Sequence, residues 1–297
     1  MRYRVVAIFL LASGLVSCGT TQNAATINGV GISAADLAQT VTDLAAVGQA
    51  QITNGVADGE TVRGVLTSLI RAEATIQVIA ASGELITDAD RATVRAELEK
   101  QDLSGVSDTF RSFLIELYAA TAVLGRLKAP SADIVAERYA DNPKSLGMLC
   151  VRHLVVNEES TAQTAFDELG TAPSDSEFAT IAGKYSIEAI AKESGGALTG
   201  QTSDCIGINE WQSGFDPDFV AGALAARTGV PTRPVKSSFG WHVIYIRPFT
   251  AVAESVSENL ATAPGEFLLL GALADAKITV ASRYGRWNPL AGSVVKP

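Results

Sequence analysis

The sequence is poor in several residue types that carry much of protein chemistry. Its 297 residues include two histidines and three cysteines, and no lysine or arginine lies between Val156 and Lys184. Acidic residues outnumber basic ones by 32 to 23, so the formal net charge is −9. Such a chain has no surplus of cations for neutralising phosphates, and nucleic acid is not an expected partner. A Gly-x-Ser-x-Gly motif is also absent, which argues against a nucleophile-elbow hydrolase.

The N-terminus has an apolar run that is too short to span a bilayer. This run covers residues 5–16 and follows Arg2 and Arg4, the pattern of a signal peptide. The next residues, Leu15-Val-Ser-Cys18, resemble a bacterial lipobox. The resemblance implies that a leader of residues 1–17 is cleaved and that the sulfur of Cys18 carries lipid. We therefore expect an extracytoplasmic protein of the bacterial cell envelope, lipid-anchored to a membrane.

The stretch from about residue 24 to residue 142 is expected to be mainly helical after a short strand at Thr26-Ile-Asn-Gly-Val. Capping residues and apolar periodicity define each helix. A Pro at position 143 ends the last of them. The predicted helices run from Ser33 to about Val47, from about Glu60 to Ala81, from Thr87 onward, from Asp108 to about Leu127, and from Pro130 to Tyr139.

The two histidines lie in two short apolar segments that are typical of β-strands. His153 belongs to residues 149–156 and His242 to residues 239–246. Alternation along a strand sends every second side chain to one face, so two paired strands could bring both rings together. Each ring could equally be an inert core histidine that hydrogen-bonds as a neutral tautomer.

The order of motifs around these histidines resembles the parvulin family of peptidyl-prolyl isomerases. The likeness extends from about residue 146 to residue 248 and rests on a series of short segments. These are the strand His153-Leu-Val-Val, a helix over 160–169, a capping box at Ser174-Asp-Ser-Glu177, the turn Gly195-Gly196-Ala-Leu198, an apolar helix headed by Phe215 and Phe219, and the closing segment Phe239-Gly-Trp-His242-Val-Ile.

This resemblance implies an α+β fold in which helices surround an antiparallel sheet, and prolyl cis/trans isomerase activity without a cofactor or metal. It also assigns roles to residues of this chain. The residues implied to be catalytic are His153, Glu188 and His242. Those implied to bind substrate are Leu198, Phe215, Phe219 and Phe239. The lack of cations between Val156 and Lys184 predicts no preference for phosphorylated residues before proline.

Two cysteines remain after Cys18, and both fall inside the parvulin-like stretch. In an oxidising compartment Cys150 and Cys205 are a candidate disulfide. A zinc site is the alternative, because Cys150 and His153 have ligand-like spacing and Cys205 and His242 could complete four ligands. We expect the disulfide, because the two histidines already have a place in the parvulin-like pattern.

Residues 24–142 followed by a parvulin-like module resemble the secreted SurA/PrsA-type foldases. The resemblance divides the chain into the leader (1–17), a helical chaperone-like domain (18–145), the parvulin-like domain (146–250), and a C-terminal helix and strand (251–297) that fold back on the helical domain. The implied partners are unfolded or partly folded exported polypeptides that contain proline. The turn departs from the family pattern at Leu198-Thr-Gly200. A non-catalytic holdase chaperone with a degenerate parvulin module is therefore the alternative.

Overall fold

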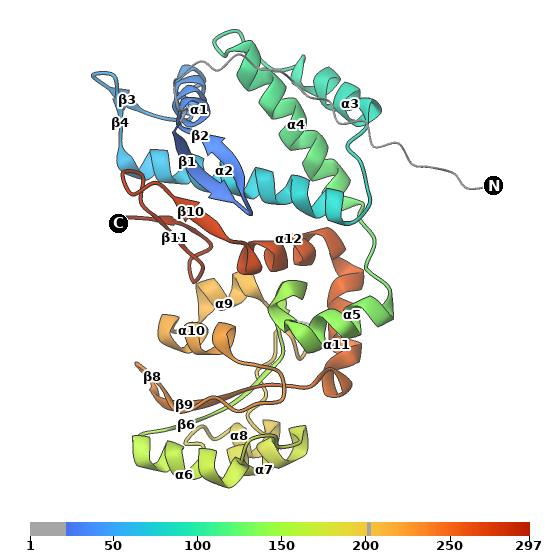
Figure 1. Cartoon of the computed structure of the whole chain (residues 1–297), viewed down its shortest axis with the longest axis vertical. Helices are drawn as coiled ribbons and strands as arrows, with labels where there is room; N and C mark the ends of the chain where they lie inside the picture. The colour runs from blue at the N-terminus through green and yellow to red at the C-terminus, as the bar shows by residue number, and fades with distance from the viewer. Residues whose placement is uncertain (1–21, 201–202) are drawn as a thin grey trace, which may run out of the picture.

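The computed structural model describes residues 22–200 and 203–297. The predicted leader and Cys18 lie outside the described residues. The chain is an α+β protein in which a helical layer is stacked on a part that contains the larger sheet (Figure 1). The first helices of the chain are α1 Ala34–Ala46, α2 Gly59–Ala81, α3 Asp88–Leu98, α4 Asp108–Gly125 and α5 Ala132–Asp141.

Helices α1 and α3 begin at the capping residues that the sequence indicates. Ser33 accepts a hydrogen bond from the Asp36 amide, and Thr87 forms a reciprocal capping box with Asp90. Helix α2 is long and apolar enough to cross a membrane, but half of its most apolar window is buried against the rest of the protein. It is therefore the central core helix of this layer.

A small antiparallel sheet joins the two ends of the described chain. Its order is β10-β1-β2, with β1 Asn23–Ile27, β2 Val30–Ser33 and β10 Ile278–Val280. Ala25 pairs with Val280, so the C-terminal segment folds back on the helical part as predicted. Two further hairpins pair β3 Ile52–Thr53 with β4 Val56–Ala57 and β11 Arg286–Asn288 with β12 Ser293–Val295. The sequence analysis missed β3 and β4 because it read this region as helical, although the dipeptide Asn54-Gly55 is a hairpin signal.

Two C-terminal helices contribute to two different cores. Helix α12 Pro264–Asp275 buries Leu269 and Leu273 with Leu66 and Ile70 of α2. Helix α11 Phe249–Thr262 instead packs in the core that contains α5 and the larger sheet. The C-terminal segment thus belongs to both parts, and the domain boundaries at 145/146 and 250/251 stay a prediction.

The larger sheet also has three strands, but two of them are longer than those of the first sheet. Its order is β6-β9-β8, with β6 Val151–Val156, β9 Gly240–Ile246 and β8 Val235–Ser237, all antiparallel. Helices lie on both of its faces (Figure 1). Leu154 and Tyr245 face one core, and Val151 and Ile244 face the other. The surrounding elements are α6 Glu159–Leu169, α7 Asp175–Tyr185, α8 Ala191–Ser194, α9 Ile208–Gly214, α10 Pro217–Ala225, the 3-10 helix η1 Pro143–Leu146, and the pair β5 Met148–Leu149 and β7 Ile206–Gly207.

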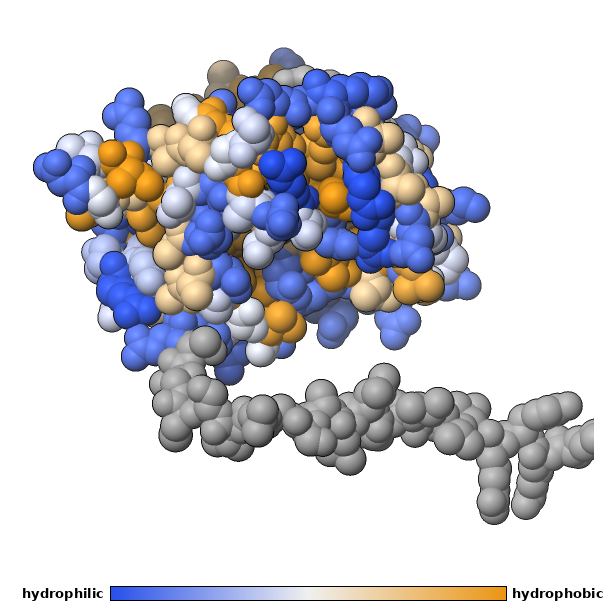
Figure 2. Space-filling model, turned by 90° about the horizontal axis from the view of Figure 1, so that it is seen from above, coloured by the Kyte–Doolittle hydropathy of each residue, from blue (hydrophilic) through white to orange (hydrophobic). Residues whose placement is uncertain are grey.

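The surface of the helical layer is mostly polar. Seen from above, charged and polar side chains surround smaller apolar patches, some of which lie recessed near the centre of this face (Figure 2).

Cys150 and Cys205 form a disulfide, as predicted. The bond joins the residue before β6 to the residue before β7, and it removes both thiols from the alternative zinc site. Among residues 22–200 and 203–297, no group of three or more His, Cys, Asp or Glu side chains is arranged to hold a metal ion.

Reduction of this disulfide is expected to lower the free energy of unfolding by about 4 kcal/mol, from the loop-closure entropy of the 55-residue separation. Urea denaturation of the oxidised protein and of a Cys150→Ser/Cys205→Ser variant measures the difference. Equal midpoints for the two proteins would contradict this expectation.

Candidate active site

The two histidines meet on one face of the larger sheet. In the register of β6 and β9, His153 is opposite Ile244 and His242 is opposite Val155, so the rings are diagonal neighbours. Their Nδ1 atoms are 3.3 Å apart and the rings are stacked with centroids 5.5 Å apart. Both residues are almost fully buried, at 5% and 4% exposure. The convergence expected from the alternating pattern is confirmed.

Each histidine has a second polar partner on the far side of its ring. His153 Nε2 lies 3.2 Å from Glu188 Oε2, and His242 Nε2 lies 2.7 Å from Ser237 Oγ. A carboxylate only accepts hydrogen bonds, so His153 carries its proton on Nε2. With both rings neutral, His242 Nδ1 then donates to His153 Nδ1, and the Ser237 hydroxyl donates to His242 Nε2. One consistent tautomer arrangement therefore links four side chains in a row.

Aromatic side chains pack against one side of this row, which consists of Glu188, His153, His242 and Ser237. The Phe219 ring, on α10, lies 4.8 Å from the His242 ring and 5.2 Å from the His153 ring. Phe219 stacks in turn on Phe215 and Trp211, at centroid distances of 6.1 and 5.9 Å. Leu198 and Phe215 are half-buried against the same core. The structure therefore groups apolar side chains beside a buried polar row.

A comparison with known proteins identifies this part of the chain. Residues 156–248 match the PPIC-type PPIASE domain, named Rotamase. They form a parvulin-type domain.

The chain is also similar to curated proteins. The chain is 34% identical over 107 residues to the foldase protein PrsA of Clostridium kluyveri. This match covers 36% of this chain and 28% of that protein. It is 28% identical over 174 residues to PrsA of Latilactobacillus sakei subsp. sakei, covering 58% and 48%. The chain thus spans less than half the length of these relatives.

Solved structures of similar proteins align with much of this chain. One is PrsA from Bacillus anthracis, which is 17% identical to this chain. The alignment covers 70% of this chain and 95% of the other, with a TM-score of 0.28. Another is PrsA from Bacillus subtilis, with 16% identity, coverages of 88% and 95% and a TM-score of 0.29.

Not every side chain predicted for substrate binding lies at the histidines. Phe239 is 72% exposed, and it is linked to the row through its backbone N–H, which donates to Ser237 Oγ. Sequence reasoning missed Ser237 and Trp211. Ser237 was missed because its place beside His242 depends on the pairing of β8 with β9. Trp211 was missed because its position depends on the packing of α9.

The carboxylate of Glu188 reaches His153. This carboxylate is 41% exposed, and the hydrogen bond from His153 holds its pKa below the usual value against the opposing effect of burial. The preceding residue is tied to the strand, because the Ile187 N–H donates to the Val155 carbonyl at 2.9 Å. An ionised Glu188 therefore faces the buried ring of His153.

Burial lowers the pKa of His242 to about 4, and the neighbouring His153 adds to the shift. The ring is therefore neutral at pH 7, in agreement with the tautomer arrangement. In the unfolded chain the same group binds a proton near pH 6.5. Between these two values the unfolded state holds more protons, so stability falls as the pH falls from about 6.5 to about 4.

The size of this pH effect can be measured directly. The wild-type protein is expected to lose about 3 kcal/mol of unfolding free energy over this interval through His242. The comparison is the difference in urea stability between wild type and His242→Gln at several pH values. Parallel profiles for the two proteins would contradict the assignment.

Proposed function

We propose that the parvulin-type domain catalyses cis/trans isomerisation of peptidyl-prolyl bonds. The observation that carries the proposal is the row Glu188–His153–His242–Ser237, buried beside the Phe219 ring within a domain of this family. The reaction needs neither a nucleophile nor a cofactor. It needs a site that binds the twisted imide better than the planar one.

Each part of the site suits a part of that task. The apolar side chains of Leu198, Phe215 and Phe219 would hold the proline ring, and the polar row would hydrogen-bond the twisted peptide. Every 1.4 kcal/mol of preference for the twisted state increases the rate about tenfold. His153, His242 and Glu188 are proposed as the catalytic residues, with Ser237 fixing the tautomer of His242.

We further propose that the protein is a foldase for exported polypeptides, because the curated relatives carry the name foldase protein PrsA. In that role unfolded or partly folded chains with proline are the substrates. The lipobox-like segment supports an anchor on Cys18 in a membrane of the cell envelope.

The anchor is tested independently of catalysis. Cys18→Ser is expected to abolish lipid attachment, so the protein should leave the membrane fraction when cells are fractionated. Unchanged processing and unchanged fractionation would refute the anchor and leave the isomerase proposal intact.

A second candidate function is favoured by a cavity away from the histidines. This cavity of about 750 Å³ lies between α2, the residues after α4, α5 and α12. Its lining mixes apolar side chains, such as Leu268 and the exposed Ile134, with charged ones such as Glu84. A holdase could bind segments of unfolded chains there without isomerising them.

One pair of assays separates the foldase from the holdase. A foldase accelerates the refolding of a protein whose slow phase is limited by a non-native proline isomer. A holdase suppresses the aggregation of the same protein and leaves that slow phase unchanged. We expect acceleration, and suppression of aggregation alone would favour the holdase.

A further inference from the structure

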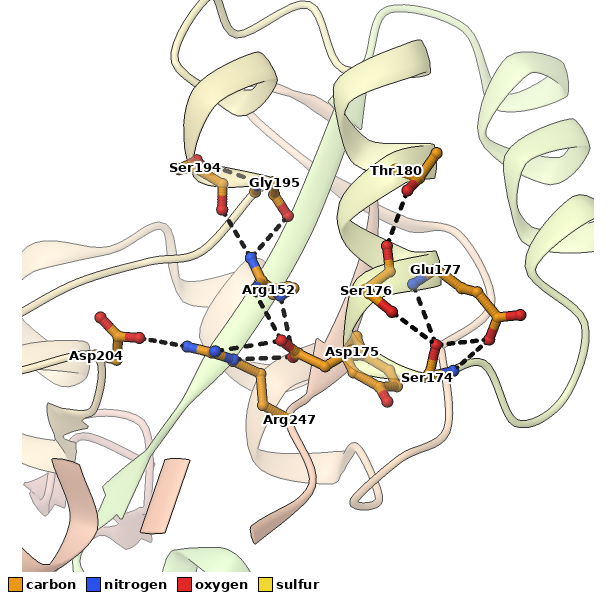
Figure 3. Close-up of polar contacts among 12 residues, drawn as sticks. Arg152, Ser174, Asp175, Ser176, Glu177, Thr180, Ser194, Gly195, Asp204 and Arg247 are labelled. Carbon is orange, nitrogen blue, oxygen red and sulfur yellow. Dashed lines mark hydrogen bonds and ion pairs between the residues drawn. The ribbon is translucent and has the colours of Figure 1, made fainter. Parts of the chain in front are cut away.

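Asp175, the first residue of α7, is a carboxylate that binds two arginines (Figure 3). Arg152 contacts it through Nε and Nη2 at 3.0 and 2.8 Å, and Arg247 through the same atoms at 2.9 and 3.2 Å. Only 19% of the Asp175 side chain is exposed, against 11% and 7% for the two arginines. Burial alone would raise the pKa of Asp175, but the hydrogen bonds and charges of Arg152 and Arg247 outweigh it and lower that pKa.

Each arginine also holds a second segment of the chain. Nη1 of Arg152 donates to the carbonyl oxygens of Ser194 and Gly195 at 2.7 and 3.2 Å. Nη1 of Arg247 donates to Asp204 at 2.7 Å. Ser194 and Gly195 on one side, and Asp204 on the other, are therefore linked through two guanidinium groups to the carboxylate of Asp175 (Figure 3).

Residues 194–198, called the 194–198 stretch below, carry part of the proposed proline slot. Leu198 lies in this stretch, and the Leu198 N–H donates to the Val151 carbonyl at 2.9 Å. The His153 N–H donates to the Gly196 carbonyl at 2.8 Å. Strand β6 thus holds the stretch through its backbone on both sides of Arg152, and through the Arg152 side chain.

Glu188 is linked to Arg152 through the short helix α8. The Ala191 N–H donates to the Glu188 carbonyl, and the short helix α8 that follows ends at Ser194, whose carbonyl binds Arg152. Alternation along β6 places Arg152 on the sheet face opposite His153. Any influence of Arg152 on the reaction therefore passes through the stretch that it holds, without contact to substrate.

We propose that Arg152 and Asp175 are positioning residues, which hold residues 188–198 against β6 so that Glu188 and Leu198 keep their places at His153. The inference rests on the proposed isomerase function and assigns it two further residues. A lysine cannot replace Arg152, because three nitrogens of one planar group bind the carboxylate and two carbonyls together.

The test compares three variants of the full, oxidised chain. Arg152→Lys keeps the charge, and Asp175→Asn keeps the shape but loses the charge. Lys184→Met is the matched control, because it removes an ion pair with Glu168 at the other end of α7. The readouts are kcat/KM for an alanine-proline peptide below the unfolding temperature, hydrogen exchange of the Leu198 amide, and the NMR signals of the His153 imidazole.

Arg152→Lys is expected to lower kcat/KM about tenfold, by misplacing the slot. It should also speed exchange of the Leu198 amide and shift the His153 signals, whereas Lys184→Met should match wild type in all three. If Asp175→Asn does not fold, Arg152→Lys alone decides. Wild-type values of the three readouts in Arg152→Lys, with only a lower unfolding temperature, would overturn the proposal.

Failure of the proposed function would look different. A wild-type protein that does not accelerate prolyl exchange refutes the isomerase. Exchange of the Leu198 amide and the NMR signals of His153 still report whether Arg152 holds the 194–198 stretch. Unchanged values of both in Arg152→Lys would overturn the positioning role of Arg152 as well.

Discussion

Replacement of His242 by alanine is expected to lower kcat/KM for prolyl isomerisation about 100-fold, because the ring orients both polar neighbours in the row that would hydrogen-bond the twisted peptide. The ring is the centre of the polar row, with Ser237 at 2.7 Å on one side and His153 at 3.3 Å on the other. Its loss removes the partner of His153 Nδ1 and the acceptor of the Ser237 hydroxyl. The rate is measured by exchange NMR on a short peptide.

A matched control lies on the same strand. The Tyr245 hydroxyl is also buried, and it donates to the Pro173 carbonyl on the other face of the sheet. Tyr245→Phe therefore removes a buried hydrogen bond without touching the row, and its kcat/KM should stay near wild type. Equal losses in the two variants would indicate that the row matters only for stability, and full activity in His242→Ala would remove His242 from the site.

Gly196→Ala is expected to destabilise the fold strongly. Gly196 has a φ of +73°, and a Cβ there would lie 2.0 Å from the backbone oxygen of His153. Backbone cannot yield as a flexible side chain does, so the turn must leave β6. Strain at positive φ costs about 1 kcal/mol and overpacking up to about 3 kcal/mol, so the expected loss is about 4 kcal/mol.

Gly229 provides the control for this substitution. It has the same φ of +73°, and an added Cβ would meet nothing within 4 Å. Gly229→Ala should therefore cost only the strain, about 1 kcal/mol. Urea denaturation of the two variants gives both values. A difference of less than about 1 kcal/mol would show that the contact between Gly196 and His153 is looser than described.

The features that the sequence predicted well are those with a local physical cause. Capping residues such as Ser33 and Thr87 bond to amides three positions away, so the helix starts can be read directly. The alternation around His153 and His242 fixes which face each ring occupies once the two strands pair. Pairing of the Cys150 and Cys205 thiols followed from their number and the expected compartment.

The features that it missed depend on contacts between distant segments. Nothing near Asp175 in the sequence indicates that Arg152 and Arg247 converge on it, because the pairing exists only after β6 and β9 are side by side. Ser237 required the register of β8 with β9. For Phe239 the family pattern gave a place in the sequence, but the exposure of its side chain is a property of the folded hairpin.

The central claim is that the buried row of His153, His242, Glu188 and Ser237 forms an isomerase site. Prolyl cis/trans exchange in an unphosphorylated alanine-proline peptide, followed by NMR with the oxidised full chain, tests it most directly. The account predicts an acceleration that disappears in His242→Ala and persists in Tyr245→Phe. An exchange rate equal to that of the free peptide, from a wild-type protein shown to be folded and disulfide-bonded, would contradict it.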